Sequence, residues 1–306
     1  MSNGWLGTPR GAAKLSLAAI VSLIGLKAVV SVVTGSISIV AQLIDSSLDL
    51  IAVTITFFAV VVASRPADAE HPFGHGKVEN LAAIAQAGLI FAAAGLVIIS
   101  AIQRIIAGTK IELAEAGIGV MLVSIIVSIF LSRHLLKVAR AADSIALEGN
   151  AHNIAADVYS AGAVLAGLVA VRFSGLNILD PIIALGVSVP IVKSGYDVLH
   201  KSFGGLVDVK LPEAEETLIE QTITTHGEVV SFHELRTRKV GSQRHIDLHL
   251  VMPREASVDE AHRICDQLEQ EIANKLRQTN VIIHVEPCSQ QCAQCPSSCP
   301  ERPGGD

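Results

Sequence analysis

The most constraining feature of the sequence is an apolar run at residues 35–64 that contains two acids, Asp45 and Asp49. A helix that spans a bilayer needs about 20 apolar residues, and this run is long enough. Each ionised aspartate near a helix centre costs about 2.5–3.5 kcal/mol on insertion scales. The i, i+4 spacing puts both carboxylates on one helical face, where they suit a divalent cation. The alternative is that they only hydrogen-bond a neighbouring helix.

The composition indicates a helical membrane protein. Half of the residues are hydrophobic and the mean hydropathy is +0.51, too apolar for an ordinary soluble domain of this length. The net charge of -6 argues against nucleic acid as a partner.

Apolar segments predict six transmembrane helices near 14–34, 36–63, 79–104, 114–138, 148–172 and 178–200. Because six is an even number, both termini lie on the same side of the membrane. The excess of Lys and Arg on that side places the termini in the cytoplasm.

The composition changes at residue 204, where polar and charged residues become frequent. Periodicity after this point predicts a helix, two strands joined by a Gly-Ser turn, a second helix and a last strand. The order α-β-β-α-β makes a small two-layer domain whose helices cover one face of the sheet. We therefore expect four parts: an N-terminal cytosolic segment 1–13, a membrane domain 14–203, a cytosolic domain 204–287 and a flexible tail 288–306.

The fifth apolar segment carries a third acid, Asp157, with Asn153 four residues earlier on the same helical face. Three carboxylates that faced one another without a cation would repel and partly protonate. A bound metal, or protons that exchange with it, removes the conflict, although these side chains could also serve only in hydrogen bonds between helices. His152 lies five residues before Asp157, about 140° around the helix, and should not share this face.

The polar loop after the second segment contains Asp68, His71 and His75 within eight residues. Two prolines and two glycines in the loop prevent a regular helix. Carboxylate and imidazole groups at this density indicate a second, water-exposed metal site. The alternative is an ordinary solvated loop.

The cytosolic domain is rich in histidine. Its pattern of alternation puts His245, Asp247 and His249 on one face of a strand. We interpret His226 and His245 as ordinary surface residues. A further group of residues either binds metal or, like His226 and His245, consists of ordinary surface residues. This group comprises His233, His249, His262, His284 and Glu286.

The last twenty residues contain four cysteines, Cys288, Cys292, Cys295 and Cys299, in a stretch dominated by Pro, Ser, Gln and Gly. Such a composition predicts no fixed structure. The thiolates could form a site for a soft metal, and an inert flexible tail is the alternative.

Several separate motifs, in order, resemble the cation diffusion facilitator family, and within it the bacterial iron/zinc efflux pump subgroup. They are D-x3-D at Asp45, HPFGHGK at His71, the aspartate at Asp157, FHELRTR and DLHL near His233, and VIIHVEP at the end. The resemblance runs from about Lys14 to Pro287.

The resemblance implies a homodimer in the inner (plasma) membrane that exports a divalent metal from the cytoplasm in exchange for protons. Each protomer would have six transmembrane helices and a metallochaperone-like cytosolic domain. By position, the transport site would be Asp45, Asp49, Asn153 and Asp157, and the loop site would be Asp68, His71 and His75. The bridging site between protomers would be His233, His249, His262, His284 and Glu286. Lys77 and Asp208 match a charge pair that holds the dimer together.

Two departures from the family pattern bear on the metal. Asn153 stands where the family usually has histidine, so the transport set contains only oxygen donors and loses the ligand that favours zinc. Glu286 replaces an aspartate and keeps the carboxylate. The sequence thus leaves Zn, Fe, Mn, Co and Cd open as the metal ion that is transported and that the regulatory sites hold.

The function expected from these features is divalent metal:proton antiport by alternating access. A metal sensor anchored in the membrane and a passive metal channel are the rival interpretations. We find no nucleophile elbow or phosphate-binding loop in the sequence and do not expect an enzyme.

Overall fold

The computed structural model describes residues 5–34, 37–107, 115–174, 176 and 178–288. Its contacts divide the chain into two compact units, Met1–Phe203 and Gly204–Asp306. The elements of the two units are treated separately below.

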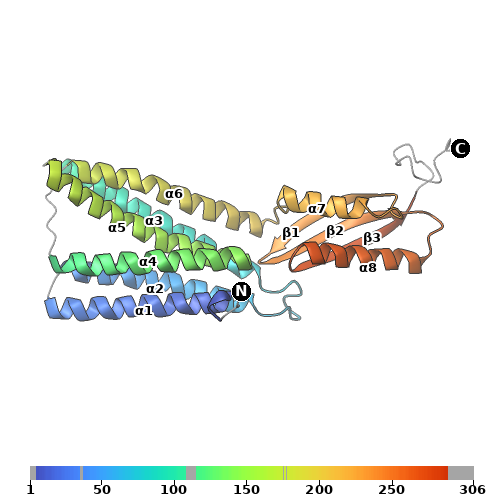
Figure 1. Ribbon diagram of the computed structural model, residues 1–306, viewed down its shortest axis with the longest axis horizontal. Coiled ribbons are helices and arrows are strands. Elements are labelled where there is room, and N and C mark those ends of the chain that lie inside the picture. Colours follow the sequence, from blue (N-terminus) through green and yellow to red (C-terminus); the bar gives the residue numbers. More distant parts are fainter. Residues whose placement is uncertain (1–4, 35–36, 108–114, 175, 177, 289–306) are drawn as a thin grey trace. The chain divides into compact units, whose positions relative to one another are not determined.

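The first unit is a bundle of long helices that run side by side (Figure 1). A short 3-10 helix, Trp5–Gly7, precedes them. The described part of the unit contains six long helices: α1 Pro9–Thr34, α2 Ile37–Ala63, α3 Lys77–Ala107, α4 Glu115–Ala142, α5 Ile145–Ser174 and α6 Leu179–Leu206.

Length and composition let four of these helices cross a membrane within the described ranges. The four stretches are Pro9–Val33, Lys77–Ile106, Leu122–Ala142 and Leu179–Leu206. In α2 the apolar stretch found in this way is shorter, Asp49–Ala63. Four of the six predicted spans are therefore long and apolar enough to cross a membrane, and the spanning role of α2 and α5, the two helices that carry the acids, remains a prediction.

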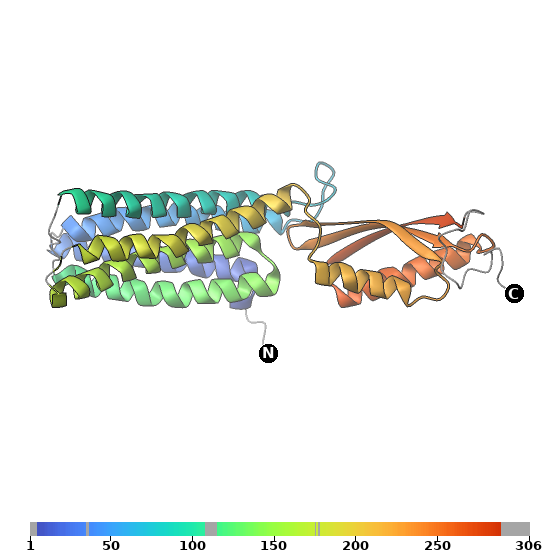
Figure 2. The ribbon, with the colours of Figure 1, turned by 90° about the horizontal axis from the view of Figure 1, so that it is seen from above.

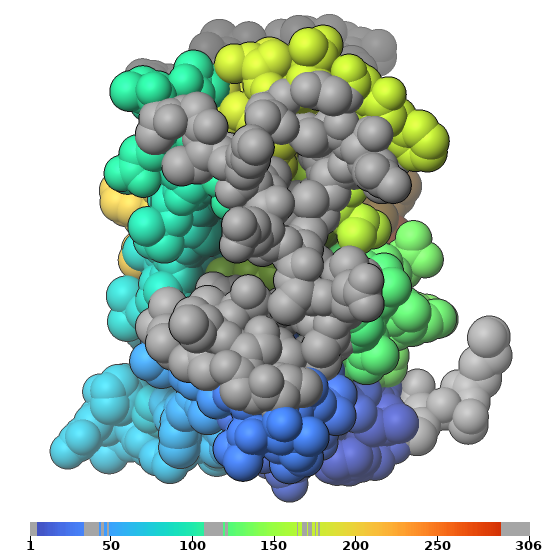
Figure 3. Space-filling model, turned by 90° about the vertical axis from the view of Figure 1, so that its left-hand side faces the viewer, coloured from blue at the N-terminus to red at the C-terminus, as the bar shows by residue number. Residues whose placement is uncertain are grey.

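The bundle packs around small residues. Its largest buried cluster is rich in alanine, including Ala12, Ala59, Ala82, Ala139 and Ala151, which lets helix backbones approach closely. Seen from the ends of the helices, α3 and α4 lie on opposite sides of the bundle (Figure 3). Helix α2 packs against α1, α3 and α5, and α4 packs against α1 and α5.

Buried polar side chains join the helices where no water is available to them. Gln86 of α3 donates hydrogen bonds from Nε2 to the Ala52 carbonyl at 2.6 Å and to Thr56 Oγ1 at 2.9 Å, both in α2. A Cβ placed at Gly149 of α5 would lie 3.2 Å from the Gln86 Cβ, so a larger residue there would push α5 away from α3. Such bonds and close contacts fix the spacing of the helices.

The start of α5 is held by an acid from another helix. Glu79 of α3 is buried and accepts hydrogen bonds from Ser144 Oγ at 2.6 Å and from the backbone N–H of Ala146 at 3.4 Å. A carboxylate at a helix N-terminus satisfies free N–H groups and opposes the positive end of the helix dipole. The helix that carries Asn153 and Asp157 therefore begins at a fixed point.

The second unit has the predicted element order. Its elements are α7 Glu213–Thr224, β1 Ser231–Val240, β2 Gln243–Met252, α8 Val258–Lys275 and β3 Thr279–Pro287. The sheet order is β1-β2-β3, with β1 antiparallel and β3 parallel to β2. The tight turn between β1 and β2 uses Gly241 at φ +62°, a left-handed conformation that glycine adopts without strain. The predicted Gly-Ser hairpin is confirmed.

The sheet has one covered face and one open face. Helices α7 and α8 lie on the same side of it (Figure 2), and Ile246, Leu248 and Leu250 of β2 pack into the core beneath them. Helix α8 begins at the Ser257 cap, whose hydroxyl accepts the N–H of Glu260 at 3.1 Å. His249 and its neighbours in register, His233 and His284, therefore lie on the open face.

We predict that Leu248→Ala destabilises the second unit by about 2–5 kcal/mol, because it removes a fully buried side chain and leaves a cavity. Ile282→Ala is the matched control: Ile282 is 58% exposed on the open face, so its loss should cost less than about 0.5 kcal/mol. Native-state hydrogen exchange of the β2 amides, in the full chain in detergent, measures both. Equal exchange in the two variants would contradict this view of the core.

Candidate metal sites

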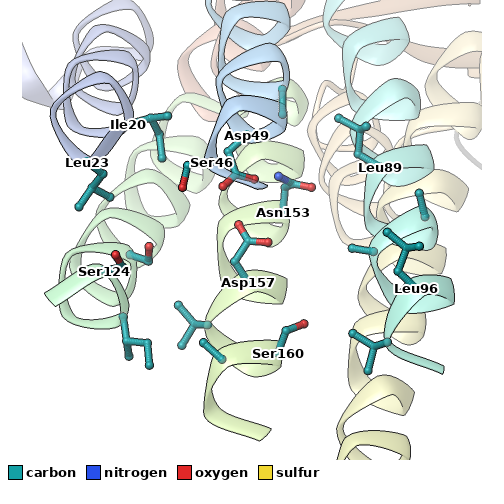
Figure 4. A pocket seen from close by; sticks show the side chains of 18 of the residues that line it. Ile20, Leu23, Ser46, Asp49, Leu89, Leu96, Ser124, Asn153, Asp157 and Ser160 are labelled. Atoms are coloured by element: carbon teal, nitrogen blue, oxygen red, sulfur yellow. The ribbon is translucent and has the colours of Figure 1, made fainter. Parts of the chain in front are cut away.

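A cavity of about 380 Å³ lies inside the helical unit and is lined by five helices (Figure 4). Its apolar walls come mainly from α3, with Leu89 and Leu96 among them, and from Ile20 and Leu23 of α1. Its polar groups include four serines, Ser46, Ser124, Ser128 and Ser160, together with residues predicted to bind metal. The cavity is therefore apolar on one wall and rich in oxygen on another.

Three of the four predicted transport-site residues line this cavity. Asp49 comes from α2, and Asn153 and Asp157 come from successive turns of α5 (Figure 4). Asn153 is only 6% exposed. Because α5 has its start fixed by Glu79 and its spacing to α2 set through Gln86 of α3, these side chains are brought together by the helix packing itself. The fourth residue, Asp45, belongs to α2, and its side chain lies outside the described part of the structure.

Sequence reasoning missed a basic residue in the same cavity. Lys27 of α1 is 7% exposed, lines the cavity, and donates a hydrogen bond from Nζ to Ser46 Oγ at 2.6 Å. The signal was present in the sequence, because Lys27 is a basic residue well inside an apolar segment. An ionisable residue at such a position indicates function by default.

His152 lies away from this cavity, as helical geometry predicts. Its Nδ1 is 2.8 Å from Ser194 Oγ of α6, and it lines a different hollow of about 470 Å³ together with Lys193 and Asp197. His152 therefore does not replace the imidazole that Asn153 lacks.

The loop between α2 and α3 gathers Asp68, His71 and His75. One ligand atom from each of the three lies within 4.8 Å of the others. Asp68 Oδ1 is 3.2 Å from His71 Nδ1, and Asp68 Oδ2 is 3.3 Å from His75 Nε2. One carboxylate and two imidazoles are a donor set that suits zinc.

The loop backbone prepares Asp68 for this role. The backbone N–H of His71 donates to Asp68 Oδ1 at 2.7 Å, and the N–H of Glu70 donates to the same atom at 3.1 Å. The bond from the His71 N–H is the main reason that the pKa of Asp68 lies below its usual value, because it favours the charged carboxylate. Asp68 is thus ionised, as a metal ligand must be.

The open face of the sheet gathers His233, His249 and Glu286, again with one ligand atom from each within 4.8 Å. His249 Nδ1 is 2.8 Å from Glu286 Oε1, and His233 Nε2 is 3.4 Å from Glu286 Oε2. His284 adjoins the group, with its Nε2 3.7 Å from Glu286 Oε1. The hydrogen bond with His249 lowers the pKa of Glu286 below its usual value. The strand register creates this cluster, since His233 and His284 both pair with His249.

A bulge in β1 adds an acid that sequence reasoning missed. The register of β1 and β2 shifts between His233 and Arg236, and Glu234 takes a left-handed φ of +50°. Glu234 Oε2 then lies 4.0 Å from His249 Nε2. No sequence signal predicts a bulge here, because no glycine marks it.

Three predicted residues of the cytosolic domain are placed differently from the expectation. His262 is not part of the cluster: it lies on α8, 75% exposed, with its Nε2 3.8 Å from Asp266 Oδ2. His245 is buried, at 6% exposed, rather than on the surface. Cys288 belongs to the folded unit and not to a tail, since it is buried and its N–H donates to the Met252 carbonyl at 2.9 Å. The other tail cysteines, Cys292, Cys295 and Cys299, lie outside the described residues.

The predicted charge pair, Lys77 and Asp208, falls on the two separate units. Lys77 is the first residue of α3. Asp208 has φ +56° and its Oδ2 is 3.7 Å from Arg238 Nη1 within the second unit. Their pairing with each other remains a prediction.

The helical unit has apolar helices long enough to cross a membrane and a cavity lined by Asp49 and Asp157. Residues 13–207 match the family described as cation efflux transmembrane domain, and residues 211–288 match the cation efflux protein, cytoplasmic domain. The chain belongs to the cation efflux family, the cation diffusion facilitators, and within it to the subgroup of the FieF pumps.

Its relatives include the cation-efflux pump FieF of Salmonella newport (strain SL254) and that of Salmonella heidelberg (strain SL476). Each is 36% identical over 256 residues, which are 84% of this chain and 85% of the relative. A solved chain of CzrB is 34% identical with a TM-score of 0.25, and the match covers 26% of this chain and 99% of that one. The family models and the FieF relatives identify the chain as a cation efflux transporter.

We predict that Glu286→Gln weakens Zn²⁺ binding at the open-face cluster at least about tenfold, because it removes the negative charge that all three neighbouring histidines face. Zn²⁺ titration of the full chain against a chromogenic chelator measures this. In the unsubstituted chain the contribution of Glu286 to Zn²⁺ binding should persist as the pH falls, because its lowered pKa keeps the carboxylate charged to more acidic pH.

Glu271→Gln is the matched control, since Glu271 also faces a histidine, His226, at 3.3 Å but lies outside the cluster. Equal Zn²⁺ affinity in the Glu286 and Glu271 variants would show that the cluster is not a metal site.

Proposed function

We propose that this chain exports divalent metal ions from the cytoplasm in exchange for protons, as a homodimer in the inner (plasma) membrane with both termini cytoplasmic. The observation that carries the proposal is that Asp49 of α2 and Asn153 and Asp157 of α5 line one cavity inside the helical unit. Acids within membrane helices are costly and typically mark ion and proton pathways. The membership of a cation efflux family supports the direction of transport.

The transported ion would bind the carboxylates of Asp45, Asp49 and Asp157 and the Asn153 amide oxygen when the cavity faces the cytoplasm. Two states of the helices, open to one side or the other, would then alternate. Outside, where protons are more abundant, protonation of the aspartates would release the metal, and the protonated site would return. Asn153 has no proton to exchange near neutral pH, so the aspartates alone would carry the protons.

The two clusters outside the cavity would hold metal in a regulatory or structural role. Asp68, His71 and His75 would hold it in the loop, and His233, His249, His284 and Glu286 would hold it on the open face of the sheet. A bound divalent ion supplies positive charge that draws these side chains together, and so favours one arrangement of the cytosolic units. A role for His262 in a site that bridges two protomers also belongs to this proposal, as does the Lys77–Asp208 pair at the dimer.

Two rival functions make different predictions. A membrane-anchored metal sensor would bind metal in the cytosolic domain without flux, and it gives acids on two separate helices no role. A passive channel would carry metal without moving protons in the opposite direction. We further propose transport rather than catalysis, in keeping with relatives that are efflux pumps.

We predict that Asp157→Ala lowers metal-driven proton movement at least about tenfold, because loss of a direct ligand should cost no less than loss of a supporting group. The measurement uses full-length protein in liposomes that contain a pH-sensitive dye, with Zn²⁺ or Mn²⁺ added outside. Asp197→Asn is the control, an acid of α6 that lines the other hollow. Proton movement that survives in the Asp157 variant would overturn the assignment, and metal flux without proton movement in the unsubstituted chain would favour the channel.

We predict that Asn153→His raises the preference for Zn²⁺ over Mn²⁺ about tenfold, because it adds an imidazole to a set of oxygen donors. Competitive uptake of Zn, Fe, Mn, Co and Cd ions by both proteins in liposomes gives the ratios. An unchanged order of metals would contradict the role assigned to Asn153.

A further inference from the structure

The cavity that holds Asp49 and Asp157 also holds an amine. Lys27 of α1 is 7% exposed and lines this cavity, and its Nζ donates to Ser46 Oγ of α2 at 2.6 Å. Ser46 lies three residues before Asp49, so both side chains are on the same side of α2. The ammonium is therefore held one helical turn from a carboxylate that is proposed to bind the transported metal.

The burial of Lys27 is unusual for its position. It lies seven residues, about 10 Å, before the end of α1 at Thr34, and a lysine there can reach toward the membrane surface. Instead its Nζ donates a hydrogen bond to Ser46 inside the bundle. Ionisable residues in membrane helices are tolerated when they face a polar interior and opposite charges. Among the described residues that line the cavity, the charged ones are Lys27, Asp49 and Asp157.

We propose that Lys27 is a tethered cation that competes with the transported metal for the cavity carboxylates. The inference rests on the proposed function and adds a residue that sets metal affinity and release. The ammonium compensates the acids when the cavity holds no metal, and it repels a divalent ion that occupies the cavity. Lys27 therefore weakens metal binding and speeds metal release, so that the carboxylates do not trap their substrate.

A merely structural role for Lys27 makes the opposite prediction. If the amine only joined α1 to α2 through Ser46, its removal would loosen the helices around the cavity, and metal affinity would fall or stay the same. If the amine competes with the metal, its removal tightens binding. The direction of the change in affinity separates the two roles.

The test compares Lys27→Met, Lys27→Gln and Lys27→Arg in the full chain. All three are made in a background with His71→Ala and His249→Ala, so that Zn²⁺ binding reports on the cavity. Zn²⁺ affinity is titrated in nanodiscs against a fluorescent chelator, and turnover is measured in liposomes. Lys14→Met is the control: Lys14 is an exposed lysine on the same helix, 13 residues, about 20 Å, from Lys27.

Lys27→Met and Lys27→Gln are expected to bind Zn²⁺ at least about tenfold more tightly and to turn over more slowly, because a positive charge beside the ion is gone. Lys27→Arg, which keeps the charge, and Lys14→Met are expected to stay within about threefold of the background protein. Lys27→Gln keeps an N–H donor for Ser46, so it separates charge from anchoring if Lys27→Met does not fold.

Unchanged or weaker Zn²⁺ binding in a folded Lys27→Gln protein would overturn the inference and leave the proposed function standing. The same experiment tests the proposed function separately. The background protein should bind Zn²⁺ in the cavity, and Asp157→Ala should abolish that binding. If the background protein binds none, the proposed function falls, and this inference falls with it.

Discussion

Charged groups inside an apolar helical unit must find their partners within the bundle, because the surrounding lipid offers none. This constraint accounts for several polar contacts between helices of the first unit. Asp180 at the start of α6 is paired with Arg104 at the end of α3 at 2.8 Å, and Glu79 caps the start of α5. Gln86 joins α3 to α2. Alanine-rich contacts elsewhere let the backbones approach closely enough for these short side chains to meet.

The same constraint separates the cavity from the other two candidate sites. In the cavity the described donors to a metal are carboxylates and an amide, and a lysine lines it with them. The loop and the open face of the sheet instead combine carboxylate with imidazole and lie where water can reach them. Oxygen donors beside a competing cation suit an ion in transit, whereas imidazole and carboxylate together suit an ion that stays. This difference in chemistry is the physical basis for assigning transport to one site and regulation to the others.

Much of this arrangement could be predicted from the sequence, because it follows from periodicity. The helical period predicts Asn153 and Asp157 on one face of a helix and His152 on another. The strand period predicts His249 and Leu248 on opposite faces of one strand. Other features depend on contacts that no local pattern records. The burial of Lys27 against Ser46 requires α1 and α2 to be packed, and the approach of Glu234 to His249 requires a bulge without a glycine. The sequence groups His262 with His249 as a candidate ligand, but His262 lies on a helix, away from the cluster. Cys288 is part of the fold because its backbone continues the bonding of β3 to β2.

The central claim is that the acids of α2 and α5 hold the transported metal. Anomalous X-ray scattering from crystals of the full chain grown with Zn²⁺ tests it most directly. The account predicts a peak inside the helical unit, with oxygen atoms of Asp49, Asn153 and Asp157 about 2.0–2.2 Å from the ion. Peaks at the loop and at the open face of the sheet, with none between α2 and α5, would contradict it.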